Sequence, residues 1–218
     1  MTPEDAPTFI EECHRLLKPE GVLRVAVPDL EQICRLYLLK LQNAIGKEPN
    51  ADEEYDWLVI ELLDQCVRER SGGEMIRYLR RKPLTAVDFV IERIGNEGRQ
   101  MLAQIGAEAE RPLERRQRVS LRAQLRVFRL WLAKQLLGPG IPRELEIGQF
   151  RVAGEVHQWM YDRFSLARLL TTTGFVAPQV VSPYSSRIPG WETFHLEADE
   201  DGSVHKPDSL VMEFLKPL

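Results

Sequence analysis

The chain has 218 residues, of which 44% are hydrophobic and 28% charged, so it can hold one domain with a sizeable core, or one domain and a large insert. Its formal net charge of −4 argues against nucleic acid or an anionic membrane as the main partner of the whole chain. No apolar stretch reaches the roughly 18 unbroken residues of a membrane span, and the three cysteines form no CxxC pair, so we expect a cytoplasmic protein.

The chain opens with a pattern of helix, turn and strand. Thr2, Pro3 and the acidic residues that follow them are typical of a helix start. Pro19-Glu20-Gly21 then ends this helix. The β-branched run Val22–Val27, ended by Pro28, predicts a mostly buried strand. The opening is therefore half of an α/β unit.

The middle of the chain is predicted to be helical. Ser71-Gly72-Gly73 interrupts this region, and Gly138-Pro139-Gly140 ends it. Apolar residues recur at helical spacing over residues 29–45, 53–70, 84–106 and 112–137.

The last part of the chain returns to an alternation of helix and strand. A helix that contains Leu166, Leu169 and Leu170 is predicted to end just before Gly174, and residues 175–181 are predicted to form a strand. Residues 199–202 are predicted to form a polar hairpin turn, and residues 209–215 a strand that is buried on both faces. We expect the strands at the two ends of the chain to belong to one sheet.

Two segments resemble a known family. The segment Phe9–Asp29, with its Leu-Lys-Pro-Glu-Gly turn, resembles the late helix and fifth strand of S-adenosylmethionine-dependent methyltransferases of the type 11 group. Glu20 stands where the first glycine of that turn is usual. Residues 154–166, together with Gly174-Phe175 and residues 206–213, are similar to the last helix and terminal strand pair of the same group.

The resemblance implies an α/β fold: a partial Rossmann-like methyltransferase sheet made of the C-terminal strands, with a large helical insert. Residues 1–29 and 156–218 would form the methyltransferase-like domain, and residues 30–155 the helical insert or lid. The implied cofactor is S-adenosylmethionine. In this group it lies on a glycine-rich loop after the first strand, and no such loop is present among the 218 residues. We therefore assign no cofactor-binding residue, and we expect no tight binding of the cofactor to this chain alone.

The family resemblance and the missing glycine-rich loop together leave two possible functions. The first is methyl transfer to an unknown small-molecule or glycan acceptor, with the helical insert excluding water from the reaction. The chain as given would then be incomplete, with the cofactor-binding half preceding Met1. The alternative is a non-catalytic remnant that acts as a binding or oligomerisation module. A sheet without its first strands has an exposed edge, which a second copy or another partner would cover.

His157 and Tyr161 are the first candidate catalytic residues. They are four residues apart, so on a helical turn they would share a face, where an imidazole and a phenol can position or deprotonate an acceptor. The alternative is a structural role for this segment, in which Trp159, Met160 and Phe164 pack the junction while Asp162 caps the next helix.

Asp29 is the third candidate catalytic residue. It follows the first strand at its carboxyl end, where ligands of open α/β sheets bind, although it can equally cap the helix that begins at Leu30. No metal site is expected, because His14, His195 and His205 are isolated in the sequence.

Five arginines in the middle region are spaced three, four, four and three residues apart, and they define a helical stripe beside an apolar one. This stripe can bind a phosphate, a nucleotide-sugar or an acidic partner. Alternatively it is a solvated face on which the methylene groups of the arginine side chains cover apolar surface. The arginines are Arg115, Arg118, Arg122, Arg126 and Arg129.

Overall fold

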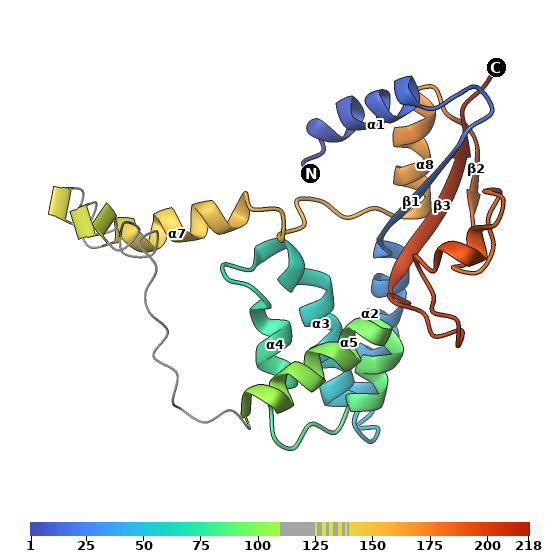
Figure 1. Cartoon of the computed structure of the whole chain (residues 1–218). Coiled ribbons are helices and arrows are strands. Elements are labelled where there is room, and N and C mark those ends of the chain that lie inside the picture. The colour runs from blue at the N-terminus through green and yellow to red at the C-terminus, as the bar shows by residue number, and fades with distance from the viewer. Residues whose placement is uncertain (110–124, 126–127, 130, 133–134, 137, 139) are drawn as a thin grey trace.

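The structure, a computed structural model, describes residues 1–109, 125, 128–129, 131–132, 135–136, 138 and 140–218. Over these residues the fold is α/β, as predicted. A small antiparallel sheet lies in one part of the molecule and a group of helices in the other (Figure 1). None of the helices in this part of the chain is both long and apolar enough to cross a membrane.

Helix α1 (Asp5–Leu16) and strand β1 (Val22–Pro28) form the predicted opening unit. In the turn between them Glu20 has a φ of 63°, a conformation that glycine adopts with little strain. The Glu20 N–H donates to the Lys216 carbonyl, and the Lys216 N–H donates to the Gly21 carbonyl, both at 2.9 Å. The turn therefore joins the beginning of the chain to its end.

Strand β1 pairs with β3 (Ser209–Leu215) in an antiparallel register that places Val25 opposite Met212. Strand β2 (Val176–Val180) pairs with the other side of β3, also antiparallel, so the order is β1-β3-β2. Two strands that are each antiparallel to a third run parallel to one another, as β1 and β2 do. The prediction that the two ends of the chain lie in one sheet is confirmed.

The burial of the strands follows their position in this sheet. β3 is central, and its residues Leu210–Phe214 are all buried, which confirms the predicted burial on both faces. The prediction of a mostly buried first strand is wrong, since β1 contains no fully buried residue. Among the described residues β1 is an edge strand that pairs with β3 alone, and the sequence of a strand does not record how many neighbours it has.

One face of the sheet is covered by α1 and by α8 (Arg163–Thr172) (Figure 1). Alternate residues of β3 point to this face, because successive side chains of a strand point to opposite sides. The core between the helices and the sheet consists of Ile10, Leu166, Leu170, Phe175, Leu210, Met212 and Phe214.

The opposite face of the sheet carries a buried ion-pair network. The Arg24 guanidinium bonds to Glu213 at 2.7 Å and to Glu197 at 2.9 Å, and it stacks 4.1 Å from the ring centroid of Trp191. Trp191 begins the short 3₁₀ helix η1 (Trp191–Phe194) in the long loop between β2 and β3. The network holds this loop against the sheet.

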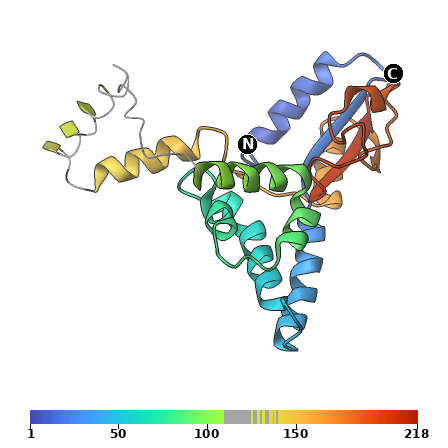
Figure 2. The same cartoon turned by 60° about the horizontal axis from the view of Figure 1, so that its bottom comes forward.

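The helical part contains α2 (Leu30–Ile45), α3 (Ala51–Val67), α4 (Gly73–Leu79) and α5 (Val87–Ala109). These helices form a group beside the sheet in both views (Figures 1 and 2). Helix α4 was not predicted, because its seven residues follow directly on Gly72 and contain too few turns to show a period. A second core joins α3, α4 and α5, and it consists of Trp57, Met75, Tyr78, Leu79, Val90 and Ile94.

Helix α5 is kinked at Gly95, which has a φ of 54° and a ψ of −134°. A Cβ atom there would collide with the Val204 carbonyl oxygen, so glycine is required for the close approach of α5 to the β2–β3 loop. Asn96 adds a side-chain hydrogen bond of 2.7 Å to Asp199 in the same loop. The helical part is thereby tied to the sheet part.

Helix α7 (Ile141–Arg151) leads into an irregular connection that reaches α8. The predicted helix over residues 112–137, and four of the five arginines of the predicted stripe, lie mostly outside the described residues. Arg129 is described and is exposed.

Candidate functional site

Three segments meet at the carboxyl end of β1. The Asp29 N–H donates to the Asp208 carbonyl at 3.0 Å, and the Leu30 N–H donates to the Tyr161 carbonyl at 3.1 Å. Asp29 Oδ1 accepts a hydrogen bond of 3.0 Å from the Gln32 N–H, so the carboxylate caps α2. Capping was one of the two roles that the sequence allows for Asp29, and its part in catalysis stays a prediction.

The segment that holds His157 and Tyr161 is irregular from residue 153 to residue 162. The expectation that the two side chains share a helical face is therefore wrong, since an i,i+4 spacing aligns side chains only within a helix. The prediction that Asp162 caps the next helix is confirmed, because its Oδ1 accepts from the Ser165 N–H at 2.7 Å. Trp159 and Phe164 are exposed rather than packed at the junction.

His157 is held in place by its backbone, whose N–H donates to the Gln65 carbonyl at 2.9 Å. Its Nδ1 atom is buried and has no hydrogen-bond partner within the described residues. Burial lowers the pKa of the imidazole, and the positive charges of Lys206 and Arg68 lower it further. The ring is therefore neutral at neutral pH, and a neutral imidazole can accept a proton or a hydrogen bond.

Asp208, which directly precedes β3, is a second buried polar group at this end of the sheet. Its side chain is only 7% exposed, and its Oδ1 makes no hydrogen bond to any described residue. Burial raises the pKa of this carboxyl to about 6, and the nearby Glu61 contributes to the rise. The charges of Lys206 and Glu97 influence the pKa values of both Asp208 and His157.

A buried network of charged side chains adjoins Asp208. Glu61 is fully buried and pairs with the Arg93 guanidinium, whose Nε donates to Glu61 Oε2 at 3.2 Å. The Trp57 indole N–H donates to the same carboxylate at 3.0 Å, and Arg93 also donates to the Gln32 side chain at 2.6 Å. These residues come from α2, α3 and α5. The network therefore fixes the helices beside the carboxyl end of β1.

The sequence indicated only part of this arrangement. Glu61 and Arg93 interrupt apolar helix faces, at Leu58-Val59-x-x-Leu62 and at Val90-x-x-x-Ile94, and a charge on such a face signals a buried partner. No sequence spacing relates them, because the two residues are 32 positions apart. Asp208 lies in a loop, where an aspartate gives no signal of burial.

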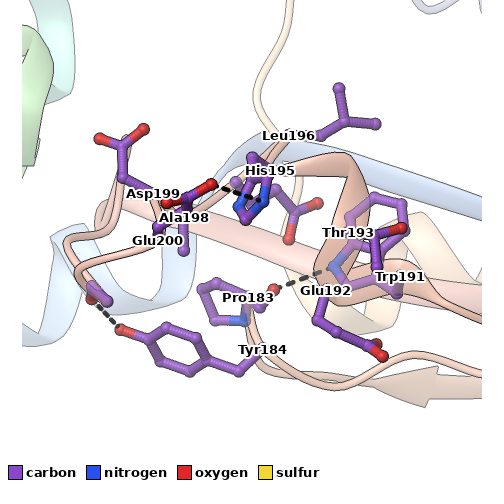
Figure 3. Close-up of a pocket in the computed structure, with 12 residues that line it drawn as sticks. Pro183, Tyr184, Trp191, Glu192, Thr193, His195, Leu196, Ala198, Asp199 and Glu200 are labelled. Carbon is purple, nitrogen blue, oxygen red and sulfur yellow. Dashed lines mark hydrogen bonds and ion pairs between the residues drawn. The ribbon is translucent and has the colours of Figure 1, made fainter.

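A separate cavity of about 510 Å³ lies in the β2–β3 loop (Figure 3). Tyr184, Trp191 and His195 are among the residues that line it. The Tyr184 hydroxyl donates to the Gly202 carbonyl at 2.7 Å, which closes one side of the cavity. Residues 199–202 form the predicted polar turn, with a hydrogen bond of 3.0 Å from the Gly202 N–H to the Asp199 carbonyl. None of the three candidate catalytic residues lines this cavity.

Gly72 and Gly73 do not form a loop of the kind that holds S-adenosylmethionine. A nucleoside cofactor needs glycines after a strand, where the backbone leaves open space for the ligand. Gly72 and Gly73 instead lie between α3 and α4, and a Cβ at Gly73 would collide with the Asp64 carboxylate. The Asp64 side chain therefore occupies the space next to Gly73, and a ligand cannot approach the backbone there. The carboxylate of Asp29, at the end of β1, is engaged as a helix cap.

Comparisons with models of protein families, with curated proteins and with solved structures found no match for this chain.

Proposed function

We propose that this chain provides the acceptor side of a methyltransferase-type enzyme, with the acceptor held at the carboxyl end of β1 and the cofactor held by residues outside the 218 of this chain. The expected acceptor is a small molecule or a glycan. The proposal rests on the family resemblance of the two end segments and on the polar groups at this end of the sheet.

The single observation that carries the proposal is that two segments that meet at the end of β1 each hold a buried polar atom without a hydrogen-bond partner among the described residues, Nδ1 of His157 and Oδ1 of Asp208. An unsatisfied buried polar atom costs about 1–3 kcal/mol, so each one calls for an explanation, and a bound ligand or a catalytic role is one. A neutral imidazole is suited to accept a proton from an acceptor hydroxyl or amine. Asp208, protonated below a pH of about 6, is suited to hydrogen-bond the same ligand.

The strand arrangement also supports the proposal. β1 and β2 are parallel, and β3 lies between them in the opposite direction. Doubly wound α/β folds have mostly parallel sheets that can include one antiparallel strand, and the proposal assigns these three strands to such a sheet, although both of their own pairings are antiparallel. In such folds, ligands bind beyond the carboxyl ends of the parallel strands, which is where Asp29 and Tyr161 form their backbone bridge.

Two experiments test the proposal. The coding sequence directly upstream of the Met1 codon should continue in frame and encode a glycine-rich loop after a strand, whereas an in-frame stop codon would overturn the proposal. Calorimetric titration of S-adenosylmethionine into the chain itself should show no tight binding. A dissociation constant in the micromolar range would contradict the division into an acceptor side and a separate cofactor side.

The second candidate function is a non-catalytic binding or oligomerisation module. The observation that favours it is the unpaired edge of β1, whose residues are only partly buried. An unpaired edge offers backbone hydrogen bonds to another strand. A stable dimer in light scattering, together with a stop codon upstream of Met1, would favour this function over the first.

A further inference from the structure

The segment between α5 and α7 is strongly basic, although the chain as a whole is acidic. Residues 111–137 contain a single acidic residue, Glu114, whereas the chain as a whole has a net charge of −4. The eight basic residues of this segment are Arg111, Arg115, Arg116, Arg118, Arg122, Arg126, Arg129 and Lys134.

The same segment presents large apolar side chains to solvent. Leu125, Phe128, Leu132 and Leu136 are each helical, and their spacing of three, four and four residues is the spacing of one helix face. Together with Trp131 they are between 41% and 72% exposed. The stacked rings of Phe128 and Trp131, with centroids 6.0 Å apart, are part of this exposed surface. We call these five residues the apolar face.

The apolar face is not covered by the rest of the described chain. In both views the described residues of this segment lie at the far end of α7, away from the sheet and from α2–α5 (Figures 1 and 2). By comparison, the six core residues of α3, α4 and α5 are at most 5% exposed. Burial against the body of this chain therefore does not account for the apolar face.

We propose that the segment that carries the apolar face binds the surface of an anionic lipid membrane. A membrane surface offers negative headgroups and an apolar layer within a few ångströms of each other, which matches a basic segment with Leu, Phe and Trp on one face. Trp131 is suited to the headgroup level, because an indole has both an apolar body and a polar N–H. This inference stands apart from the proposed function.

The charge of the segment also argues against its pairing with itself. A symmetric contact between two copies would bring together two segments with eight basic residues each, and like charges repel. A membrane supplies the opposite charge instead. A membrane-bound segment lies in the plane of the surface and does not span the bilayer.

The test is flotation of the full chain with two kinds of vesicle, one of phosphatidylcholine alone and one of phosphatidylcholine mixed with phosphatidylserine. We expect binding to the anionic vesicles to be at least about tenfold tighter, and to weaken as salt is added. The double variant Phe128→Ser/Trp131→Ser should lose this binding without a change in charge. Val152→Ser is the matched control, because Val152 is 84% exposed but lies outside the segment, and it should bind as the wild type does.

Other outcomes overturn the proposal. Equal binding to both kinds of vesicle, absence of binding to either, or full binding by the double variant would each do so. A dimer that light scattering detects in the wild type but not in the double variant, without vesicle binding, would assign the apolar face to a second copy. Binding of an acidic peptide without vesicle binding would assign it to a protein partner.

Discussion

Replacement of Asp208 by Asn should stabilise the protein at neutral pH and leave its stability at low pH unchanged. In the folded protein, burial raises the pKa of this carboxyl from 3.8 to about 6. Between these two values the unfolded chain has lost the proton of Asp208 while the folded chain still holds it. The free energy of unfolding therefore falls as the pH rises through this window, and the loss is complete above a pH of about 6.

The size of the stability difference follows from the size of the pKa shift of Asp208. One pKa unit corresponds to about 1.4 kcal/mol, so a shift of roughly two units corresponds to about 3 kcal/mol. Asp208→Asn cannot ionise, so the variant should exceed the wild type by about this amount near neutral pH and match it near a pH of about 4. Since burial is the largest cause of the shift, the gain reflects the removal of a charge that is poorly solvated in the folded state.

Urea unfolding followed by circular dichroism, at a series of pH values, measures the difference. Comparison with the wild type at each pH cancels the titration of the other carboxyl groups. Glu192→Gln is the control, because Glu192 is exposed and its replacement should not alter the pH dependence. Equal stabilities of Asp208→Asn and the wild type near neutral pH would refute the reasoning.

Three further substitutions test the fold, each by the midpoint of urea unfolding. Glu20→Gly should stabilise the protein by about 1 kcal/mol, because the φ of 63° at this position strains a residue with a Cβ; a lower midpoint would contradict this. Gly95→Ala should destabilise by about 2 kcal/mol or more, through positive φ and a collision with the β2–β3 loop. Gly148→Ala, which meets no atom within 4 Å, is the control that should cost nothing. Glu213→Gln should cost about 3 kcal/mol, because it removes a charge from the buried pair with Arg24; a loss below about 1 kcal/mol would show that the pair is not a major contribution.

Elements with strong local signals could be predicted from the sequence. The turn after α1, the caps at Asp29 and Asp162, and the buried strand β3 each follow from a few adjacent residues. These elements form because of local conformational preferences, which depend on the types and spacing of adjacent residues. The expectation that the strands at the two ends of the chain belong to one sheet came from the alternation of helix and strand there, and the pairing of β1 with β3 confirms it, although which strands pair was not predicted.

Features that depend on distant neighbours could not be predicted. β1 has an ordinary strand sequence, and its partial exposure accompanies its position at the edge of the described sheet. The Glu61–Arg93 pair and the burial of Asp208 depend on the packing of α3 and α5 at the sheet. His157 was a candidate on the wrong grounds, since it lies in an irregular segment rather than on a helix, yet its buried Nδ1 keeps it among the candidates.

The most direct test of the account is transfer of a labelled methyl group from S-adenosylmethionine to small-molecule and glycan fractions by the protein that the whole reading frame encodes. We expect transfer, and a loss of turnover of about tenfold or more in His157→Gln, the size expected when a catalytic proton acceptor is removed. Glu192→Gln should leave turnover unchanged. Absence of any methyl transfer, or full turnover by His157→Gln, would contradict the assignment of this end of the sheet as the acceptor site.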